Sequence, residues 1–273
     1  MTPSEMARAL RISPKTLRAR LRRMKTAGDP RLKGHLHNER WLFDAELAHE
    51  LMNGFQRRVG DTLAVRAADS AGSAKPSTST DAVHEHPRGH GHRVRQTWIG
   101  VECDTLEDLL RPGLLAVCVG INPTPASVAA GHYYQGEYGQ RFFDRLRRVE
   151  LLLDGVRGRE DDAAFASGVG FTDLVKRPTR GESDLTREER QYGRSILEAK
   201  IAAADPDLVI FAFKSAAVTL LGPFEHHGFI GRQIAGADVF VMPGPTAKPE
   251  IVEAALAPLT ERVALLRVVR DLP

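Results

Sequence analysis

The stretch that decides the fold is LLAVCVGINP, at residues 114–123. Six apolar residues in a row are followed by a glycine, an asparagine and a proline. A short apolar run bounded by turn residues is typical of a strand buried on both faces of a parallel sheet. The turn residues then emerge at the carboxyl end of that strand, where open α/β sheets bind their ligands. Asn122 is therefore a candidate site residue, and the alternative is an ordinary strand-to-loop turn.

The chain beyond this strand keeps alternating between apolar runs and amphipathic stretches. Strands are expected at 114–119, 208–213 and 239–242, and helices at 140–153, 188–204 and 250–268. This alternation predicts an α/β fold with a mostly parallel sheet covered on both faces.

The first 60 residues carry most of the positive charge of the chain. They hold 13 Lys and Arg against 6 Asp and Glu, a local charge of +7, so that the remainder carries −4 of the total of +3. Such segregation favours a polyanionic partner, most simply nucleic acid, for the amino-terminal module. A basic surface that is merely solvated is the alternative.

The amino-terminal module has the pattern of a helix-turn-helix. A first helix begins at Thr2 or Ser4, and Ser13 is placed to cap a second helix with Pro14 in its first turn. The basic residues of the second helix that are candidates for DNA contact are Lys15, Arg18 and Arg22. A short strand at 41–43 and a helix at 44–52, capped by Asp44, would complete a small bundle. The competing interpretation is a helical packing or dimerisation module.

A low-periodicity stretch rich in Ala, Ser, Thr and Gly follows this module and predicts a flexible linker. It contains His84, His86, His90 and His92. Because neither thiolates nor a fixed scaffold accompany them, a solvated tract with nonspecific metal affinity is favoured over a structural metal site. The predicted organisation is a helix-turn-helix-like module at 1–59, the linker at 60–96 and an α/β domain at 97–273.

The two cysteines, Cys103 and Cys118, fit neither a disulfide framework nor a metal cluster. Cys118 lies inside the apolar strand and is expected to be a buried small hydrophobe. Since no signal core or membrane-spanning stretch is evident, the expected location is the cytoplasm, in association with the nucleoid.

Four motifs occur in the order found in mismatch-specific uracil/thymine DNA glycosylases. They are residues 120–123 (GINP), 131–134 (GHYY), 170–179 (GFTDLVKRPT) and 242–248 (MPGPTAK). The α/β domain therefore resembles this branch of the uracil-DNA glycosylase superfamily, over residues 113–266. The resemblance does not extend to the helix-turn-helix or the linker.

The resemblance implies a three-layer α/β/α fold, no cofactor or metal, and cleavage of the N-glycosidic bond of a mispaired or damaged base. It implies that Asn122 positions the attacking water, and that Gly120 and the backbone amide of Ile121 lie against the leaving base. Tyr134 matches the aromatic residue that stacks on the extruded base. His132 and Tyr133 are expected to line the adjoining wall, although ordinary core aromatics are the alternative.

Asp173 matches a variable polar position near the base. Its carboxylate is expected to accept the imide N–H of uracil or to help activate water, and a capping or surface carboxylate is the alternative. Lys248 matches the position that enters the duplex where the base has left, with Thr246 and Ala247 beside it. Arg177 and Lys176, which Pro178 and Thr179 follow, are further candidates for phosphate contact, and a packing turn is the alternative.

Two residues depart from the family pattern. Thr124 replaces a common glycine after the proline, and Gly244 replaces a small polar residue. Both are expected to change pocket width or base preference, and the extent of any loss of activity is open. The paired Asp and His of the strongest uracil excisers are not recognisable, which predicts slow, mismatch-biased activity.

The sequence thus predicts a monomeric, monofunctional glycosylase that acts on double-stranded DNA containing a mismatched or damaged base, with no membrane partner. The preferred lesion is open among uracil, thymine, ethenocytosine and deaminated purines, and so is sequence reading by the amino-terminal module. The rival hypothesis is a DNA-binding regulator whose glycosylase-like domain is inactive and senses a nucleobase.

Overall fold

A computed structural model describes residues 1–33, 41–69 and 91–270 of the chain. The chain divides into two compact units, the first formed by residues 1–83 with 261–273 and the second by residues 84–260. No helix in the described ranges combines the length and the apolar character that a membrane span requires.

The first unit begins with the two capped helices that the sequence predicts. Helix α1 (Pro3–Ala9) has a capping box formed by Thr2 and Glu5. Helix α2 (Pro14–Thr26) begins after Ser13, whose Oγ accepts a hydrogen bond from the Thr16 amide at 3.1 Å. These side chains satisfy amide groups that the first turn of a helix leaves without partners, so both helices begin where the sequence places them.

The third helix differs from the expectation in length. Helix α3 (Ala45–Asp69) begins after Asp44, whose Oδ1 accepts from the Leu47 amide at 2.7 Å. It continues through residues 60–69, which were expected in the linker, because this stretch contains three alanines and no proline, and alanine favours helix without any periodic pattern. The centre of the expected linker, with His84, His86 and His90, lies outside the described residues.

Residues 41–43 do not form the expected strand. The Phe43 amide donates to the Met1 carbonyl at 2.8 Å, and the amino terminus donates back to the Phe43 carbonyl. This pairing is too short to count as a strand. A single 3₁₀ turn (Pro30–Leu32) precedes it in the sequence.

The last helix contributes to both units. Helix α9 (Pro249–Arg270) begins in the second unit, and its residues from Glu261 onward belong to the first. There the Arg262 guanidinium donates to the Arg11 carbonyl, and Arg23 Nη2 donates to the Val269 carbonyl at 3.4 Å. The α/β domain expected at 97–273 therefore gives up its carboxyl end to the amino-terminal unit.

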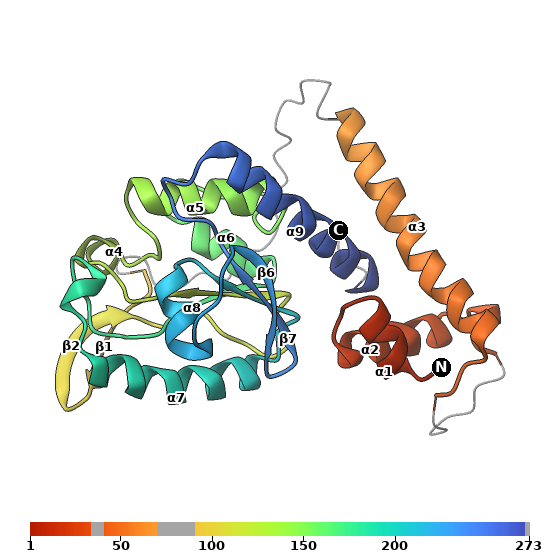
Figure 1. Ribbon diagram of the computed structural model, residues 1–273, viewed down its shortest axis with the longest axis horizontal. Coiled ribbons are helices and arrows are strands. Elements are labelled where there is room, and N and C mark those ends of the chain that lie inside the picture. The colour runs from red at the N-terminus through yellow and green to blue at the C-terminus, as the bar shows by residue number, and fades with distance from the viewer. Residues whose placement is uncertain (34–40, 70–90, 271–273) are drawn as a thin grey trace. The chain divides into compact units, whose positions relative to one another are not determined.

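The second unit is built on a five-stranded sheet with the order β4-β3-β5-β7-β6. The strands are β3 (Ala116–Gly120), β4 (Val169–Asp173), β5 (Leu208–Phe211), β6 (Gly228–Ile234) and β7 (Ala237–Val241). Strands β4, β3, β5 and β7 are parallel, and β6 pairs antiparallel at one edge. The prediction of a mostly parallel sheet covered by helices on both faces is confirmed (Figure 1).

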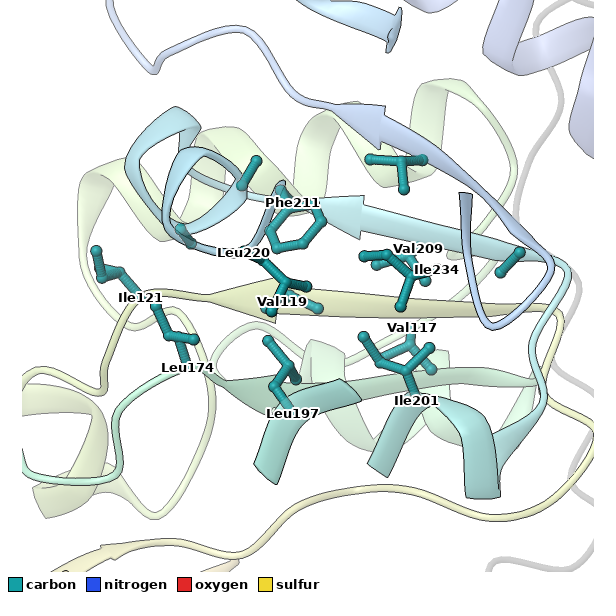
Figure 2. Close-up of a cluster of buried hydrophobic side chains, with 14 of the residues drawn as sticks. Val117, Val119, Ile121, Leu174, Leu197, Ile201, Val209, Phe211, Leu220 and Ile234 are labelled. Carbon is teal, nitrogen blue, oxygen red and sulfur yellow. The ribbon is translucent and has the colours of Figure 1, made fainter. Parts of the chain in front are cut away.

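One face of the sheet packs against α7 (Arg187–Ala204) and α8 (Lys214–Leu221). Figure 2 shows Val117 and Val119 of β3 among side chains of β5 and of these helices. On the other face lies α5 (Glu137–Arg148), whose Phe143 ring is 6.1 Å from that of Phe171 in β4. Successive side chains of a strand point to opposite faces, and helices cover both faces here. Every residue of β3 is therefore buried, and none of them is polar.

The remaining elements of the second unit are short. They are the hairpin of β1 (Arg93–Trp98) with β2 (Val101–Leu106), the short helices α4 (Pro125–Ala130) and α6 (Glu160–Ala166), and the 3₁₀ turn Glu182–Asp184. The start of β1 corrects the other end of the expected linker, since Arg93 is already in a strand. Helix α5 ends at Arg148 rather than at residue 153 because Glu150 adopts a left-handed conformation, with φ of 61°.

Candidate active site

Two candidate catalytic residues follow neighbouring parallel strands. Asn122 comes directly after β3, and Asp173 is the last residue of β4. The pairing continues beyond the strands, because the Leu174 amide donates to the Gly120 carbonyl at 3.0 Å and the Val175 amide to the Ile121 carbonyl at 2.9 Å. The two segments therefore hold both side chains at one edge of the sheet.

The side-chain amide of Asn122 has a fixed orientation. Its Nδ2 donates to the Arg177 carbonyl at 3.2 Å and to Thr179 Oγ1 at 2.8 Å, and it lies 3.1 Å from the Pro123 carbonyl. The Thr179 hydroxyl donates its own proton to the Gly181 carbonyl at 2.7 Å, so it can only accept from Asn122. Because all of these partners are acceptors, the nitrogen faces them and Oδ1 faces away.

Asp173 is a buried carboxyl group with 3% of its surface exposed. Burial raises its pKa to about 7, with the Asp108 charge adding to the rise, while Lys176 and Lys200 oppose it. Within the described part of the chain, neither Asp173 Oδ2 nor the Tyr134 hydroxyl has a hydrogen-bond partner. Buried polar atoms without partners are rare and are typical of sites that receive a ligand.

Gly120 brings these two groups to the same point. A Cβ at this position would lie 2.0 Å from Asp173 Oδ1 and 3.3 Å from the Tyr134 hydroxyl oxygen. A side chain at this position would have to displace the Asp173 carboxyl group. The glycine at the end of β3 therefore makes room for a carboxyl and a phenol, two residues before Asn122 in the sequence.

A network of ion pairs centred on Asp108 acts electrostatically on Asp173. Asp108 accepts from Lys176 Nζ at 2.8 Å, from Lys200 Nζ at 2.5 Å and from the Thr172 hydroxyl at 2.7 Å. Lys176 is 1% exposed, so its ammonium group is not available to contact phosphate. The network instead places two positive charges near Asp173.

The aromatic loop after α4 is partly enclosed in the core. Tyr133 is 1% exposed, and its hydroxyl donates to the Glu107 carbonyl at 2.8 Å. Tyr134 has a φ of 51° and packs with its ring centroid 4.7 Å from that of Phe142. Gly139 makes this packing possible, because a Cβ there would lie 1.6 Å from the Tyr134 carbonyl oxygen. Tyr134, rather than Tyr133, presents a polar atom to the site.

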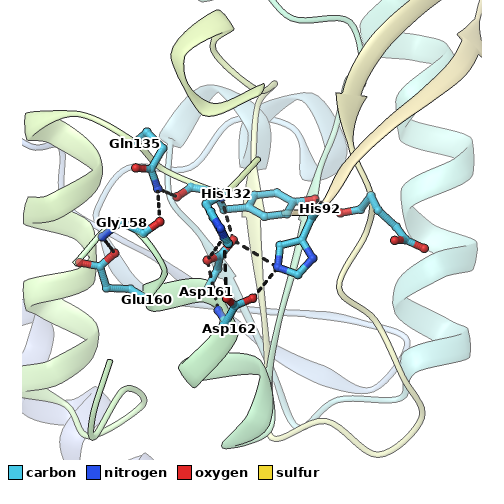
Figure 3. Close-up of polar contacts among 9 residues, drawn as sticks. His92, His132, Gln135, Gly158, Glu160, Asp161 and Asp162 are labelled. Carbon is cyan, nitrogen blue, oxygen red and sulfur yellow. Dashed lines mark hydrogen bonds and ion pairs between the residues drawn. The ribbon is translucent and has the colours of Figure 1, made fainter. Parts of the chain in front are cut away.

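His132 turns toward two aspartates at the start of α6. Its Nδ1 lies 3.0 Å from Asp161 Oδ1, and Asp161 Oδ2 accepts from the Tyr133 amide at 2.8 Å. His92 approaches from the start of β1, with Nε2 2.6 Å from Asp162 Oδ1 (Figure 3). The His132 ring is thus engaged in a polar cluster next to the aromatic loop.

The loop after β7 is held by two arginines of α5. Arg145 donates to the carbonyls of Pro243 and Gly244, the latter at 3.0 Å, and Arg141 Nη1 donates to the Pro245 carbonyl at 3.0 Å. Thr246 and Lys248 are exposed, Ala247 is half-buried, and α9 begins directly after Lys248. The structure therefore presents Lys248 at the surface on a braced loop.

Arg177 is committed to an ion pair. Its Nε and Nη2 donate to the two carboxylate oxygens of Glu189 at 2.5 and 2.9 Å. The hydrogen bonds from Arg177 lower the pKa of Glu189 to about 2. Phosphate contact by this guanidinium would require breaking the pair, whereas its backbone carbonyl already orients Asn122.

The two departures from the family pattern have different structural settings. Thr124 caps α4, since its Oγ1 accepts from the Ser127 amide at 3.1 Å. Gly244 has open space around it, and a Cβ there would meet nothing within 4 Å.

A cavity of about 310 Å³ opens beside α4, lined by Arg93, Asp104, Pro125, Val128, Ala129 and Pro178. It adjoins the loop that follows Asn122 without including Asn122 itself.

The candidate DNA-contacting residues of the first unit lie on α2. Lys15, Arg18 and Arg22 are all exposed, and Leu17, Leu21 and Met24 form the buried side of the helix. Arg18 Nη2 donates to Ser4 Oγ at 2.8 Å. The expected separation of a basic and an apolar face is present.

Sequence reasoning did not identify the residues that support the site. Thr179 was visible in the motif at 170–179, where a threonine follows a proline, and an acceptor for Asn122 could have been sought there. Asp108 and Lys200 lie far apart in the sequence and carry no local signal. Asp161 and Asp162 read as acidic residues of the first turn of a helix, which is their usual role.

Comparison with known proteins agrees with this geometry. Residues 108–249, about half of the chain, match the family described as the uracil DNA glycosylase superfamily. A G/U mismatch-specific uracil DNA glycosylase of Schizosaccharomyces pombe is 33% identical over 98 residues. That similarity covers 35% of this chain and 30% of the length of the relative.

Proposed function

Because the chain belongs to the uracil DNA glycosylase superfamily, we propose that it is a monofunctional DNA glycosylase that excises uracil from G-containing mismatches. The observation that carries the proposal is a pair of partnerless polar atoms, of Asp173 and Tyr134, that meet at Gly120, together with the fixed amide of Asn122 two residues further along the chain. The relative from Schizosaccharomyces pombe, named for G/U mismatches, supports the choice of lesion.

Asn122 is assigned to the attacking water. With Nδ2 held by Arg177 and Thr179, Oδ1 is free to accept a hydrogen from a water placed against the sugar carbon. An amide is too weak a base to remove the proton early, so its contribution is orientation of the water and stabilisation of the positive charge that develops on the sugar.

Asp173 and Tyr134 are assigned to the edge of the flipped base. An ionised Asp173 accepts the imide N–H of uracil, and the Tyr134 hydroxyl donates to a carbonyl oxygen of the base. Satisfying these buried atoms makes uracil binding favourable, and a base without the matching groups would leave them without partners. The Ile121 amide is assigned to the leaving base, whose negative charge it would stabilise. A ring stacked on the base would hold its hydroxyl out of the base plane, so the edge contact of Tyr134 replaces the stacking that the resemblance implies.

Lys248, with Thr246 and Ala247, is assigned to the duplex. The two arginines of α5 brace this loop, so that Lys248 can occupy the space that the base leaves and contact phosphate. A mispaired base costs less to extrude than a paired one, which supplies selectivity before the base reaches the pocket.

Strand cleavage is not part of the proposed reaction. In the proposed reaction the nucleophile is the water that Asn122 orients, and no lysine is assigned to attack the sugar. Lys176 is ion-paired to Asp108 inside the protein, and Lys248 is assigned to the vacated space and to phosphate. The expected product is an abasic site.

The first unit is assigned to retention on DNA through the exposed face of α2, with Lys15, Arg18 and Arg22 contacting phosphate. In a cell this would keep the enzyme in the cytoplasm on the nucleoid. The expected form of the enzyme is a monomer that needs no cofactor.

The test is base release from labelled G·U, A·U, G·T and single-stranded uracil oligonucleotides, with alkali revealing abasic sites. We expect the G·U duplex to be the best substrate. Asn122→Ala should reduce excision at least roughly tenfold, a barrier increase of about 1.4 kcal/mol or more. Asn53→Ala, the same change in the first unit, should leave excision unchanged.

Absence of excision on every substrate, with DNA binding intact, would refute the enzymatic proposal. It would favour the regulator hypothesis, in which the same pocket senses a base without cleaving it. Release of thymine or ethenocytosine in preference to uracil would keep the reaction and replace the lesion.

A further inference from the structure

A polar cluster next to the aromatic loop is not used by the proposed reaction. His92 precedes β1, His132 lies in the loop after α4, and Asp161 and Asp162 lie in the first turn of α6. One ligand atom from each side chain lies within 4.8 Å of the others. The four side chains come from three separate segments and converge on one point (Figure 3).

We propose that His92, His132, Asp161 and Asp162 bind one divalent transition-metal ion, with Zn²⁺ the best fit. Two imidazole nitrogens and two carboxylate oxygens form a four-ligand set suited to tetrahedral zinc. Hard cations such as Mg²⁺ prefer oxygen ligands and retain several waters, so this donor set disfavours them.

The spacing of the donors agrees with that geometry. The nitrogen-to-oxygen distances between these histidines and the nearer oxygens of each aspartate are 2.6, 3.0, 3.9 and 4.0 Å, with both oxygens of each carboxylate among them. One donor atom from each of the four side chains lies within 4.8 Å of the others. Ligands about 2.0 to 2.1 Å from a tetrahedral ion lie about 3.3 Å from one another, within this range. Side-chain shifts on the order of 1 Å would convert the hydrogen-bonded cluster into a coordination shell, with release of the bound protons.

The cluster is also largely buried, which distinguishes it from an ordinary surface group of acids. The side chains of Asp161, His132 and His92 are 1%, 8% and 10% exposed, and that of Asp162 is 43% exposed. Two carboxylates in such a setting need compensating positive charge, which a divalent ion supplies. The exposed side of Asp162 leaves a path for the ion to enter.

The backbone around the cluster is fixed before any ion binds. The His92 amide donates to the Gly131 carbonyl at 2.7 Å, and the Tyr133 amide donates to Asp161 Oδ2 at 2.8 Å. Gly91 makes the first contact possible, since a Cβ there would lie 2.4 Å from the Gly131 carbonyl oxygen. A site built on a fixed backbone binds metal more tightly than a solvated histidine tract.

The expected role of the ion is structural. It would join the start of β1 and the start of α6 to the loop that carries Tyr134, and so hold the aromatic wall of the pocket. It lies outside the set of atoms assigned to the reaction. Removal of the ion is therefore expected to lower excision only to the extent that this loop becomes less ordered.

The test uses the full chain, stripped of metal and titrated with Zn²⁺ by calorimetry, with metal content measured after dialysis. We expect one tightly bound equivalent and a higher Tm with zinc. X-ray absorption should show nitrogen and oxygen ligands alone, at about 2.0 to 2.2 Å. The proposal would be overturned if zinc bound no more tightly than it does to free histidine. It would also be overturned if the spectrum showed sulfur among the zinc ligands.

Variants separate this site from the neighbouring histidines. His92→Gln and Asp161→Asn should each weaken binding at least roughly tenfold, whereas the triple variant His84→Ala, His86→Ala, His90→Ala should keep the single equivalent. His226→Gln and Asp154→Asn serve as matched controls and should bind as the parent does. Loss of binding in the triple variant, with His92→Gln unaffected, would refute the proposal.

His92→Gln guards against failure of Asp161→Asn to fold, because Asp161 also accepts a hydrogen bond from the Tyr133 backbone amide and its replacement is the more disruptive change. If Asp161→Asn is unfolded by circular dichroism, the affinity of His92→Gln and the absorption spectrum of the parent decide the outcome. A zinc spectrum unchanged by His92→Gln would count against the proposal.

Discussion

Asp173 combines two demands that oppose each other. The base edge needs a polar group inside the pocket, and burial makes the ionised form of that group costly. The structure compensates in part through Lys176 and Lys200, which lie near enough to favour the carboxylate. A raised pKa close to neutrality is the result, as expected for a group held in place for function rather than for stability.

The stability of the enzyme should therefore fall with rising pH because of Asp173. Its pKa is about 7 in the folded state, above its ordinary value of 3.8, so the folded state binds the proton more tightly. The free energy of unfolding then decreases as the pH rises from about 4 to 7, by up to about 4 kcal/mol. Asp173→Asn should remove this dependence and raise Tm at pH 8 with little change at pH 4.

Urea unfolding of the two proteins across this pH range measures the effect. Asp154→Asn, at an exposed position, is the control and should follow the parent. Parallel pH profiles for Asp173→Asn and the parent would show that the carboxyl group is not destabilised in the fold.

The environment of Asp173 gives a second prediction at the same scale. Lys176→Met removes a buried positive charge that favours the ionised carboxyl, so the pKa of Asp173 should rise further. Asp108 then loses one of its two ammonium partners and the fold is destabilised, on the order of 3 kcal/mol. The combination of Lys176→Met with Asp108→Asn should recover part of that loss, and NMR titration of labelled aspartate carboxyl carbons follows the pKa.

At the scale of elements, the sequence indicated which strand end carries Asn122, but it did not indicate the ion pairs that surround the site. The apolar run of β3 and its glycine located Asn122 at a strand end, because burial on both faces leaves a signal in consecutive residues. The strand β4 was not identified in advance, although its motif was. The contacts of Lys176 with Asp108 and of Arg177 with Glu189 join residues whose spacing follows no helix or strand period, so a single sequence gives no indication of them.

Helix α5 acts on the loop after β7, and this can be tested. Arg145→Met removes the donors to Pro243 and Gly244 while keeping much of the apolar volume of the side chain. The loop that carries Lys248 should lose its fixed position, which raises KM for G·U duplexes several-fold and leaves single-stranded uracil less affected. Arg148→Met, on the same helix but paired with Glu253, is the control. Equal losses on both substrates would assign Arg145 to stability alone.

Helix α2 makes its own prediction for the first unit. Replacing Lys15, Arg18 and Arg22 together by alanine should weaken DNA binding and reduce the slope of log affinity against log salt by about 2 to 3. Excision at saturating enzyme should not change. An unaltered salt slope would favour the alternative of a packing or dimerisation module.

At the scale of the whole molecule, the sharing of α9 between units limits how the chain can be truncated. The residues of α9 that belong to the first unit include Val263, Leu266 and Val269, which are at most 1% exposed. A fragment of residues 84–273 would expose them and should aggregate. A fragment of residues 84–260 should remain monodisperse in light scattering, and the reverse behaviour would show that this end of α9 is stabilised within the second unit.

The same sharing bears on how such proteins are inherited. A recombination event in the segment between α3 and β1 would pass on the basic amino-terminal module without the helix end that completes its core. In the hybrid protein, the module would pack against the carboxyl end of an α9 that had evolved with a different amino-terminal module. The two stretches are separated by nearly the whole glycosylase-like domain, but they belong to one compact unit, so they should change together from one lineage to the next.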